Sequence, residues 1–179
     1  MPHIAWTEIE SFYNIRKYAK AHPEILNGSP KVTYRCKIKL HGSNGAVRCH
    51  EDGNIIPQSR TQDLVDGQDN AGFGKWVEQT KAHWQNKEFA GNVIFGEWAG
   101  PGVQNGVALS QIPEKIFAIF SARPLNSEDD TLIVEPEELA KFAKDEKNTY
   151  VIPWHDDQIV EIDSLKSPEE LQSIVDKIN

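Results

Sequence analysis

The sequence has no apolar run near the roughly 20 residues that cross a membrane, and its N-terminus lacks the apolar core of a signal peptide. Cysteine is scarce: only Cys36 and Cys49 are present, without a metal-ligand pattern, which favours free thiols in a reducing compartment over a lone disulfide. The 179 residues are 39% hydrophobic and 26% charged, enough for one globular domain or part of a larger one. We expect a cytoplasmic protein without a membrane partner, and leave the nucleus open.

Common signature motifs of nucleotide and metal sites are also missing. The sequence has no P-loop pattern, no dinucleotide-binding glycine fingerprint and no His/Cys spacing of a zinc site. Asp156 and Asp157 follow His155 and could bind a cation, but an acidic loop in an acidic region is the simpler interpretation. We therefore assign no residue as a metal ligand.

The net charge of −8 argues at first against a nucleic-acid partner. Residues 31–123 hold 11 Lys and Arg against 9 Asp and Glu, a balance of +2. Residues 124–179 hold 5 against 15, a balance of −10. The acidity therefore lies in the C-terminal part, and the middle of the chain is compatible with a phosphate-binding surface.

The N-terminal part predicts a helix and then a strand. Thr7-Glu8-Ile9-Glu10 matches a helix capping box, so we expect a helix from there to about His22, before Pro23. From Val32, apolar and polar residues alternate, which predicts a strand that ends at Lys39. The polar face of this strand holds Thr33, Arg35, Lys37 and Lys39.

The rest of the chain predicts an α+β domain built on antiparallel strands. Trp76, Val77, Thr80 and Trp84 recur at helical spacing, so we expect a helix over 75–86 with its tryptophans in the core. Residues 61–74 are rich in Gly, Asp, Asn and Gln and predict a surface loop. The other expected elements are strands at 46–49, 55–59, 93–95 and 116–121, a turn at 52–54, and, after a helix and short strands, a last helix that begins at Ser167-Pro168.

Lys39 lies in a setting that suits phosphate chemistry, at a predicted strand end before the small polar turn His41-Gly42-Ser43-Asn44. A lysine in water is protonated at neutral pH, and burial or neighbouring cations favour the free amine, which can attack phosphorus. Arg35 and Lys37 are candidates for such cations. Taken alone, the pattern also fits a strand that ends in a Gly-Ser turn with a solvated lysine.

Four segments in order resemble successive motifs of the RNA ligase family, covalent nucleotidyltransferases related to DNA ligases and mRNA capping enzymes. The form K-x-H-G-[ST]-N, rather than K-x-D-G, is similar to the phage-type ligases that seal nicks in duplex RNA, and so is the continuation Glu97 to Gln104. The resemblance covers residues 32–121. The four segments are Lys39-Leu40-His41-Gly42-Ser43-Asn44, Ser59-Arg60, Phe95-Gly96-Glu97 and Phe117-Ala118-Ile119-Phe120.

The resemblance implies an α+β nucleotidyltransferase fold, ATP-grasp-like, with antiparallel sheets flanked by helices. It implies a single adenylyltransferase domain over 1–179, with nucleotide motifs in 32–121 and an acidic part in 124–179. The implied reaction starts when Lys39 attacks the α-phosphorus of ATP and forms lysyl-AMP. AMP then passes to an RNA 5′-phosphate, and a 3′-hydroxyl displaces it to join the strands, with Mg²⁺ as cofactor.

Matched residue by residue, the resemblance also assigns the nucleotide contacts. Phe120 would stack on adenine, which needs a flat apolar platform, and Glu97 would accept hydrogen bonds from the ribose hydroxyls. Arg60 would contact ribose or phosphate. The remaining expected nucleotide-binding residues are Ile38, Gly42, and His41 and Asn44, which would organise the α-phosphate and the hydrated metal.

The family has two further motifs: a Glu-Gly strand that supplies a carboxylate for the metal, and a K-x-K strand that contacts the α-phosphate. After Phe120 the sequence has neither. Such charges act mainly in the transition state, so we expect a domain that is incomplete at its C-terminus and weak or inactive alone. The missing C-terminal part of the ligase is then an expected partner.

Two other interpretations remain open. The chain could be a non-catalytic nucleotide- or RNA-binding module of the same fold, which the missing motifs favour. It could also belong to a DNA ligase or a capping enzyme, although an aspartate would then be expected in place of His41. The leading hypothesis is an ATP-dependent RNA ligase domain with Lys39 as its nucleophile.

Overall fold

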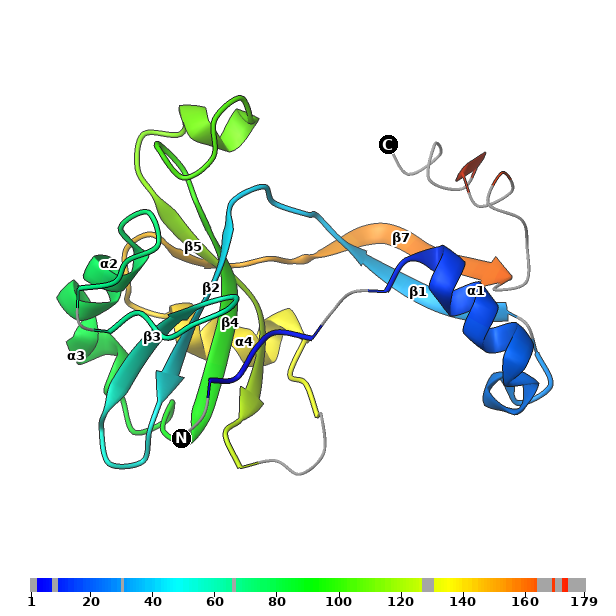
Figure 1. Cartoon of the computed structure of the whole chain (residues 1–179), viewed down its shortest axis with the longest axis horizontal. Coiled ribbons are helices and arrows are strands. Elements are labelled where there is room, and N and C mark those ends of the chain that lie inside the picture. The colour runs from blue at the N-terminus through cyan, green and yellow to red at the C-terminus, as the bar shows by residue number, and fades with distance from the viewer. Residues whose placement is uncertain are drawn as a thin grey trace. The chain divides into compact units, whose positions relative to one another are not determined.

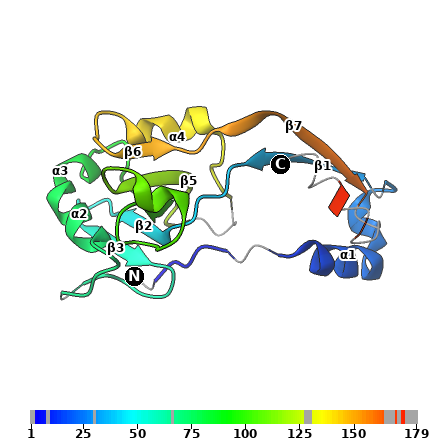
Figure 2. The same cartoon turned by 90° about the horizontal axis from the view of Figure 1, so that it is seen from above.

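The structure is a computed structural model that describes residues 3–7, 10–29, 31–65, 67–126 and 131–163, together with 169, 172 and 173. The chain divides into two compact units (Figures 1 and 2). The first unit comprises residues 1–6 and 39–153, and the second comprises residues 7–38 and 154–179. A single domain over 1–179 stays a prediction.

The first unit is built on a five-stranded sheet with the strand order β3-β2-β4-β5-β6 (Figure 1). Neighbouring strands are antiparallel except for β5 and β6, which are parallel. The predicted α+β fold with antiparallel strands is therefore confirmed. The strands are β2 (Ser43–Cys49), β3 (Ile55–Ser59), β4 (Asn92–Ala99), β5 (Ile116–Pro124) and β6 (Thr149–Val151).

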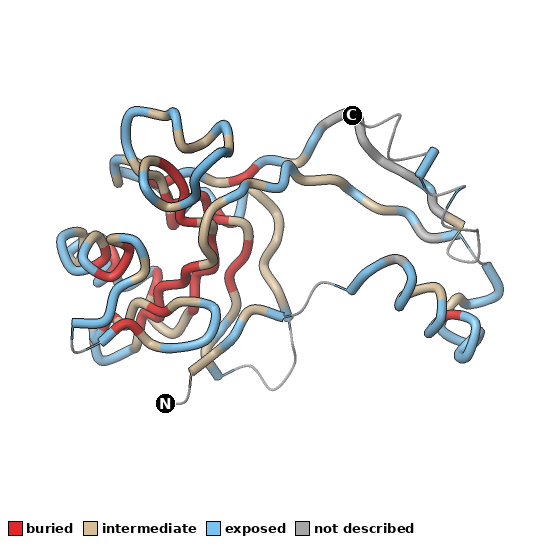
Figure 3. Tube along the Cα trace, turned by 45° about the horizontal axis from the view of Figure 1, so that its top comes forward, coloured by how far each residue is buried: buried red, intermediate tan, exposed pale blue. Residues whose placement is uncertain are grey.

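One face of this sheet carries the main hydrophobic core, to which α2 (Phe73–Gln79), α3 (Lys81–Trp84) and α4 (Pro136–Ala143) contribute. Figure 3 shows the buried residues along the sheet strands and the helices beside them. Trp84 is fully buried, as the helical spacing predicted. The single helix expected over 75–86 is instead two short helices that meet at Thr80. A further 3₁₀ turn is formed by η2 (Ala108–Gln111).

The opposite face of the sheet carries a smaller apolar cluster. Its buried members are Ala46, Val93 and Phe95. Four partly buried residues pack against them, two from the N-terminal segment and two from β5 and the residue after it: Ile4, Trp6, Phe120 and Leu125. The N-terminal segment thus belongs to the first unit, although the chain then enters the second unit.

The second unit contains α1 (Phe12–Ala21), the 3₁₀ turn η1 (Pro23–Leu26) and an antiparallel pair of strands, β1 (Lys31–Lys37) and β7 (Trp154–Asp163). The predicted start of the first helix is wrong. Ser11 is the N-cap, because its hydroxyl accepts the N–H of Asn14 at 3.3 Å. Thr7 lies outside the helix, whereas the predicted end at His22 is confirmed.

The predicted end of the first strand is also wrong. β1 ends at Lys37, which pairs with Trp154 at the start of β7 after a register shift that follows Arg35, and Lys39 belongs to the first unit. Lys39 therefore does not share a strand face with Arg35 and Lys37. Those two cations lie over the ring of Trp154, at 4.4 and 4.3 Å from its centroid.

Other expected elements agree with the structure, with longer bounds. β3 has the predicted residues, and β5 continues from Ile116 past 121 to Pro124. β4 runs through Glu97 to Ala99, so Glu97 lies inside a strand rather than after it. The start of the expected last helix at Ser167-Pro168 lies outside the described residues. No helix among the described residues has the length and apolar content to cross a membrane.

Candidate nucleotide site

The segment that leads into β2 is held by the backbone of Gly42. The Gly42 N–H donates to Glu97 Oε1 at 2.9 Å, and its carbonyl accepts from Gln104 Nε2 at 3.1 Å. A Cβ atom at this position would overlap the carbonyl oxygen of Trp98, so only glycine lets the segment lie this close to β4. Lys39 and His41, both exposed, come shortly before this fixed point in the sequence.

Glu97 lies in the middle of the sheet. Antiparallel pairing places it opposite Asn44 on β2 and Ala118 on β5. Burial raises the pKa of Glu97, while the Gly42 N–H and the charges of Lys39 and His41 act in the opposite direction. The carboxylate is thus partly desolvated and close to the lysine and histidine of the Lys39–Asn44 segment.

Phe120 is the extra residue of a β-bulge. Phe95 pairs with Ser121 and Gly96 pairs with Ile119, so Phe120 has no opposite residue on β4. Bulges turn side chains out of the regular alternation and are common beside functional sites. Phe120 is two residues from Ala118, which pairs with Glu97, so its half-buried ring lies on the face that also carries Phe95.

Several predicted site residues therefore share one face of the sheet. Residues two apart on a strand point to the same side, and so do directly paired residues of neighbouring strands. We call this surface the site face, defined by Asn44, Ala46, Phe95, Glu97 and Phe120.

The other predicted residues have different positions. Arg60 follows β3, the edge strand, and its carbonyl oxygen is 3.1 Å from Nε2 of His3. Ile38 belongs to the second unit, and its side chain is exposed. The structure thus brings together Gly42, Asn44 and Glu97 directly, and Lys39 and His41 through their charges.

Three supporting residues were missed as functional candidates in the sequence. Gln104 was visible only as the end of a longer motif, and Trp6 only as part of the N-terminal segment. Asn70 lies in a stretch that predicted a plain loop, yet it accepts from the hydroxyl of Ser43 at 2.9 Å and donates to the carbonyl of Asn44 at 3.3 Å. The composition of this loop does not indicate the role, because asparagine is common in turns of every kind.

The loop that carries Asn70 is itself well braced. The carboxylate of Asp69 accepts the N–H groups of Asn70, Gly72 and Gly74 at 2.8, 2.9 and 2.8 Å. The carbonyl of Ala71 accepts from Lys115 Nζ at 2.6 Å and from the Trp98 indole at 3.1 Å. The start of β2 is therefore positioned from both sides, by β4 and by this loop.

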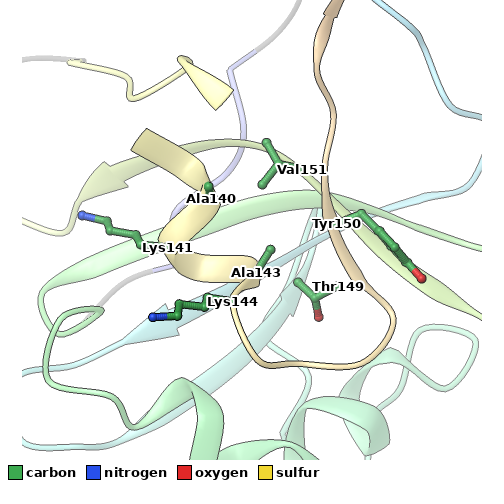
Figure 4. Close-up of a pocket in the computed structure, with 7 residues that line it drawn as sticks. All are labelled: Ala140, Lys141, Ala143, Lys144, Thr149, Tyr150 and Val151. Carbon is green, nitrogen blue, oxygen red and sulfur yellow. The ribbon is translucent and has the colours of Figure 1, made fainter. Parts of the chain in front are cut away.

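A shallow pocket of about 530 Å³ lies elsewhere, between α4 and β6 (Figure 4). Lys141 and Lys144 extend away from the strand in this view, and Tyr150 points away from the helix. It is lined by Ala140, Lys141, Ala143, Lys144, Thr149, Tyr150 and Val151, none of which is a predicted site residue.

Metal-binding side chains do not gather anywhere in the part of the chain that the structure describes, where no three His, Cys, Asp or Glu residues are placed to hold an ion. The side chains of Asp156 and Asp157 lie outside that description.

Comparison with known proteins identifies relatives of this arrangement. The family model of RNA ligases matches residues 33–175, and no curated protein matches the chain. Three solved structures of Naegleria gruberi RNA ligase are similar in fold. They are a lysine-to-alanine variant with ATP and Mn (17% identity, TM-score 0.63), a glutamate-to-alanine variant with AMP and Mn (16%, 0.62) and a second glutamate-to-alanine variant with ATP and Mn (14%, 0.64).

Each of these comparisons covers 95% of this chain and 47% of the solved chain. The chain thus spans about half the length of the ligases that it matches. At such low identity the likeness establishes the fold, and it confirms the predicted resemblance at the level of architecture.

Proposed function

The chain belongs to the RNA ligase family, and on this premise we propose that it forms the nucleotide site of an ATP-dependent RNA ligase with Lys39 as nucleophile. The observation that carries the proposal is the bond between Gly42 and Glu97. It joins two segments 55 residues apart in the sequence, and Phe120 lies on the same face. A lysine, a carboxylate and an aromatic ring so arranged suit the phosphate, ribose and base of one nucleotide.

The residues fit ATP at the level of chemistry. Glu97 uses Oε1 for Gly42, and a carboxylate has further lone pairs with which it can accept ribose hydroxyls. Phe120 offers an apolar ring for adenine. Asn44, opposite Glu97, and His41 belong to the Lys39–Asn44 segment and would order the α-phosphate, and Arg60, which follows β3, would contact ribose or phosphate. Gly42 would act by holding the Lys39–Asn44 segment against β4 through its bonds to Glu97 and Gln104.

The proposed first step is an attack by the free amine of Lys39 on the α-phosphorus of ATP. A nitrogen–phosphorus bond forms, the bond to the bridging oxygen breaks, and pyrophosphate leaves with the electron pair while the amine proton passes to solvent. Mg²⁺ bound with the triphosphate would offset the charge that develops on the phosphates. In the next steps AMP moves to an RNA 5′-phosphate, and a 3′-hydroxyl displaces AMP as the strands join.

The sequence lacks the Glu-Gly and K-x-K segments after Phe120. Charged groups that act on a transferring phosphoryl group contribute several kcal/mol to its transition state, roughly 3–4 kcal/mol for one donor. We therefore propose that lysyl-AMP formation by this chain alone is slow and that a C-terminal part of the ligase would accelerate it in trans.

The test is the intact mass of the protein after incubation with ATP and Mg²⁺, with and without a C-terminal ligase segment in trans. We expect an AMP-sized adduct that is absent from Lys39→Ala. Lys37→Ala is the matched control, because Lys37 is two residues away but lies over Trp154, and it should keep the adduct. An adduct on Lys39→Ala would refute the nucleophile, and ATP binding without any adduct would favour a non-catalytic binding module.

A further inference from the structure

The N-terminal segment crosses the same face of the sheet as the proposed nucleotide site. The carbonyl of Ile4 accepts from Nε2 of the buried Gln58 on β3 at 2.5 Å. Ile4 and Trp6 both pack against the cluster of Ala46, Val93 and Phe95. In the sequence, α1 and β1 lie between this segment and the sheet. The segment nevertheless packs on the face of the sheet that carries Glu97.

Trp6 contacts the predicted adenine platform. Its ring centroid is 4.8 Å from that of Phe120, with the planes at 68°, and 5.1 Å from that of Phe95, with the planes at 56°. Tilted and edge contacts of this kind are favourable between aromatic rings, so the contact with Trp6 restricts the orientation of the Phe120 ring. Phe120 is the bulge residue of β5, whereas its neighbours Ile119 and Ser121 are paired with residues of β4. The contact of Phe120 with Trp6 is therefore independent of the strand pairing.

The other end of the segment reaches the residues that follow β3. The two ring nitrogens of His3 lie 3.1 Å from the carbonyl oxygen of Arg60 and 3.2 Å from the carboxylate of Asp63. Asp63 in turn forms an ion pair with the fully buried Arg48. The segment of residues 3–6 therefore contacts two predicted nucleotide-site residues: Trp6 contacts the ring of Phe120, and His3 contacts the backbone carbonyl of Arg60.

We propose that Trp6 is a positioning residue of the nucleobase site, which holds the ring of Phe120 in the orientation that stacks on adenine. This inference rests on the proposed function and adds the N-terminal segment to the site. It assigns Trp6 an effect on the base of the nucleotide and none on its phosphates.

The experiment compares ATP with inorganic tripolyphosphate, which lacks a base, by calorimetric titration of the full chain. Trp6→Leu removes the aromatic ring, and Trp6→Phe keeps one. We expect Trp6→Leu to weaken ATP binding about two- to tenfold, the range of an aromatic pair, while tripolyphosphate binding stays within about twofold. Trp6→Phe should bind ATP nearly as tightly as the unmodified protein does.

Ile4→Ala is the matched control, because Ile4 packs on the same cluster in the same segment without a ring. It should lower the melting temperature yet leave the ratio of ATP to tripolyphosphate affinity unchanged. A Trp6→Leu variant that binds ATP normally, or loses both ligands equally, would overturn this inference alone. An unmodified protein that binds no ATP would overturn both this inference and the proposed function.

Discussion

Gly42→Ala tests the contact that joins the lysine segment to β4. The new Cβ would overlap the carbonyl oxygen of Trp98 and lie 2.9 Å from its carbonyl carbon and 3.0 Å from Cβ of Ala99. These are backbone or short side-chain atoms in the middle of a sheet, so they cannot rotate away. Either β4 shifts, or the segment moves off β4 and breaks the bonds of Gly42 with Glu97 and Gln104.

Both responses have a cost that can be estimated. Overpacking typically costs about 1–3 kcal/mol, and a hydrogen bond to a charged group contributes about 1.5–3 kcal/mol. We expect the free energy of unfolding to fall by about 2–4 kcal/mol. In a chain of this size that corresponds to a lower melting temperature by roughly 5–15 °C. The Lys39 segment should also lose its place beside Glu97, so AMP adduct formation should fall with it.

Urea denaturation measures the change, and Gly106→Ala is the control. Gly106 also loses conformational freedom on substitution, since its φ is +76°, but a Cβ there meets nothing within 4 Å. The control should therefore lose only about 1 kcal/mol from the backbone conformation. If Gly42→Ala is no less stable than Gly106→Ala, the contact with Trp98 does not constrain the segment, and the reasoning fails.

Three further predictions follow from the same structure. Burial raises the pKa of Glu97, so the folded state holds the proton of this carboxyl more tightly than the unfolded state does. In urea titrations, the free energy of unfolding of the wild type should therefore fall relative to that of Glu97→Gln as the pH rises from about 4 to 7. A difference between the two proteins that does not change with pH would contradict this. Asn70→Ala should lower the free energy of unfolding by about 1–3 kcal/mol, because the Ser43 hydroxyl and the Asn44 carbonyl lose their hydrogen bonds to this side chain. Asn70→Asp keeps the acceptor for the Ser43 hydroxyl and should lose less. Burial raises the pKa of Cys49 to about 12, so at about pH 8 a thiol reagent should modify Cys36 first and Cys49 only on unfolding; equal rates would contradict the buried thiol.

Local periodicity predicted the parts of the fold that local forces determine. The strand over 55–59 was predictable because a turn with Gly53 precedes it and apolar residues follow. The burial of Trp84 was predictable because helical spacing places it with Val77 on one face. These features depend on residues within one or two turns of each other in the sequence.

Features that depend on a distant partner were not predictable. Alternation continues in the sequence to Lys39, but β1 ends at Lys37, which pairs with Trp154, the first residue of its partner strand β7, more than 100 residues later. The bulge at Phe120 likewise exists only relative to β4. The position of Trp6 on the site face required knowledge of both the sheet and the chain path through the second unit.

The candidate site shows the same division. The resemblance marked Lys39, Glu97 and Phe120 one by one, but it did not indicate what holds them in place. In the structure the lysine segment contacts Gln104, the last residue of the continuation after Glu97, and Asn70, while Phe120 contacts Trp6; Asn70 and Trp6 belong to none of the motifs. Such supporting residues act through geometry, and many residue types can provide an equivalent contact, so a pattern of letters does not reveal them.

Glu97 shows why this support would matter for the proposed reaction. Its Oε1 accepts the N–H of Gly42, so the carboxylate holds the segment that carries Lys39 against β4. A carboxylate can accept about four hydrogen bonds, and the same group can therefore engage ribose without releasing the segment. Glu97, in the middle of the sheet, would then position both the nucleotide and the segment that carries Lys39. A site organised before binding loses less entropy when the reacting atoms meet, so in the proposed reaction this arrangement would favour attack by Lys39 over attack by a flexible surface lysine.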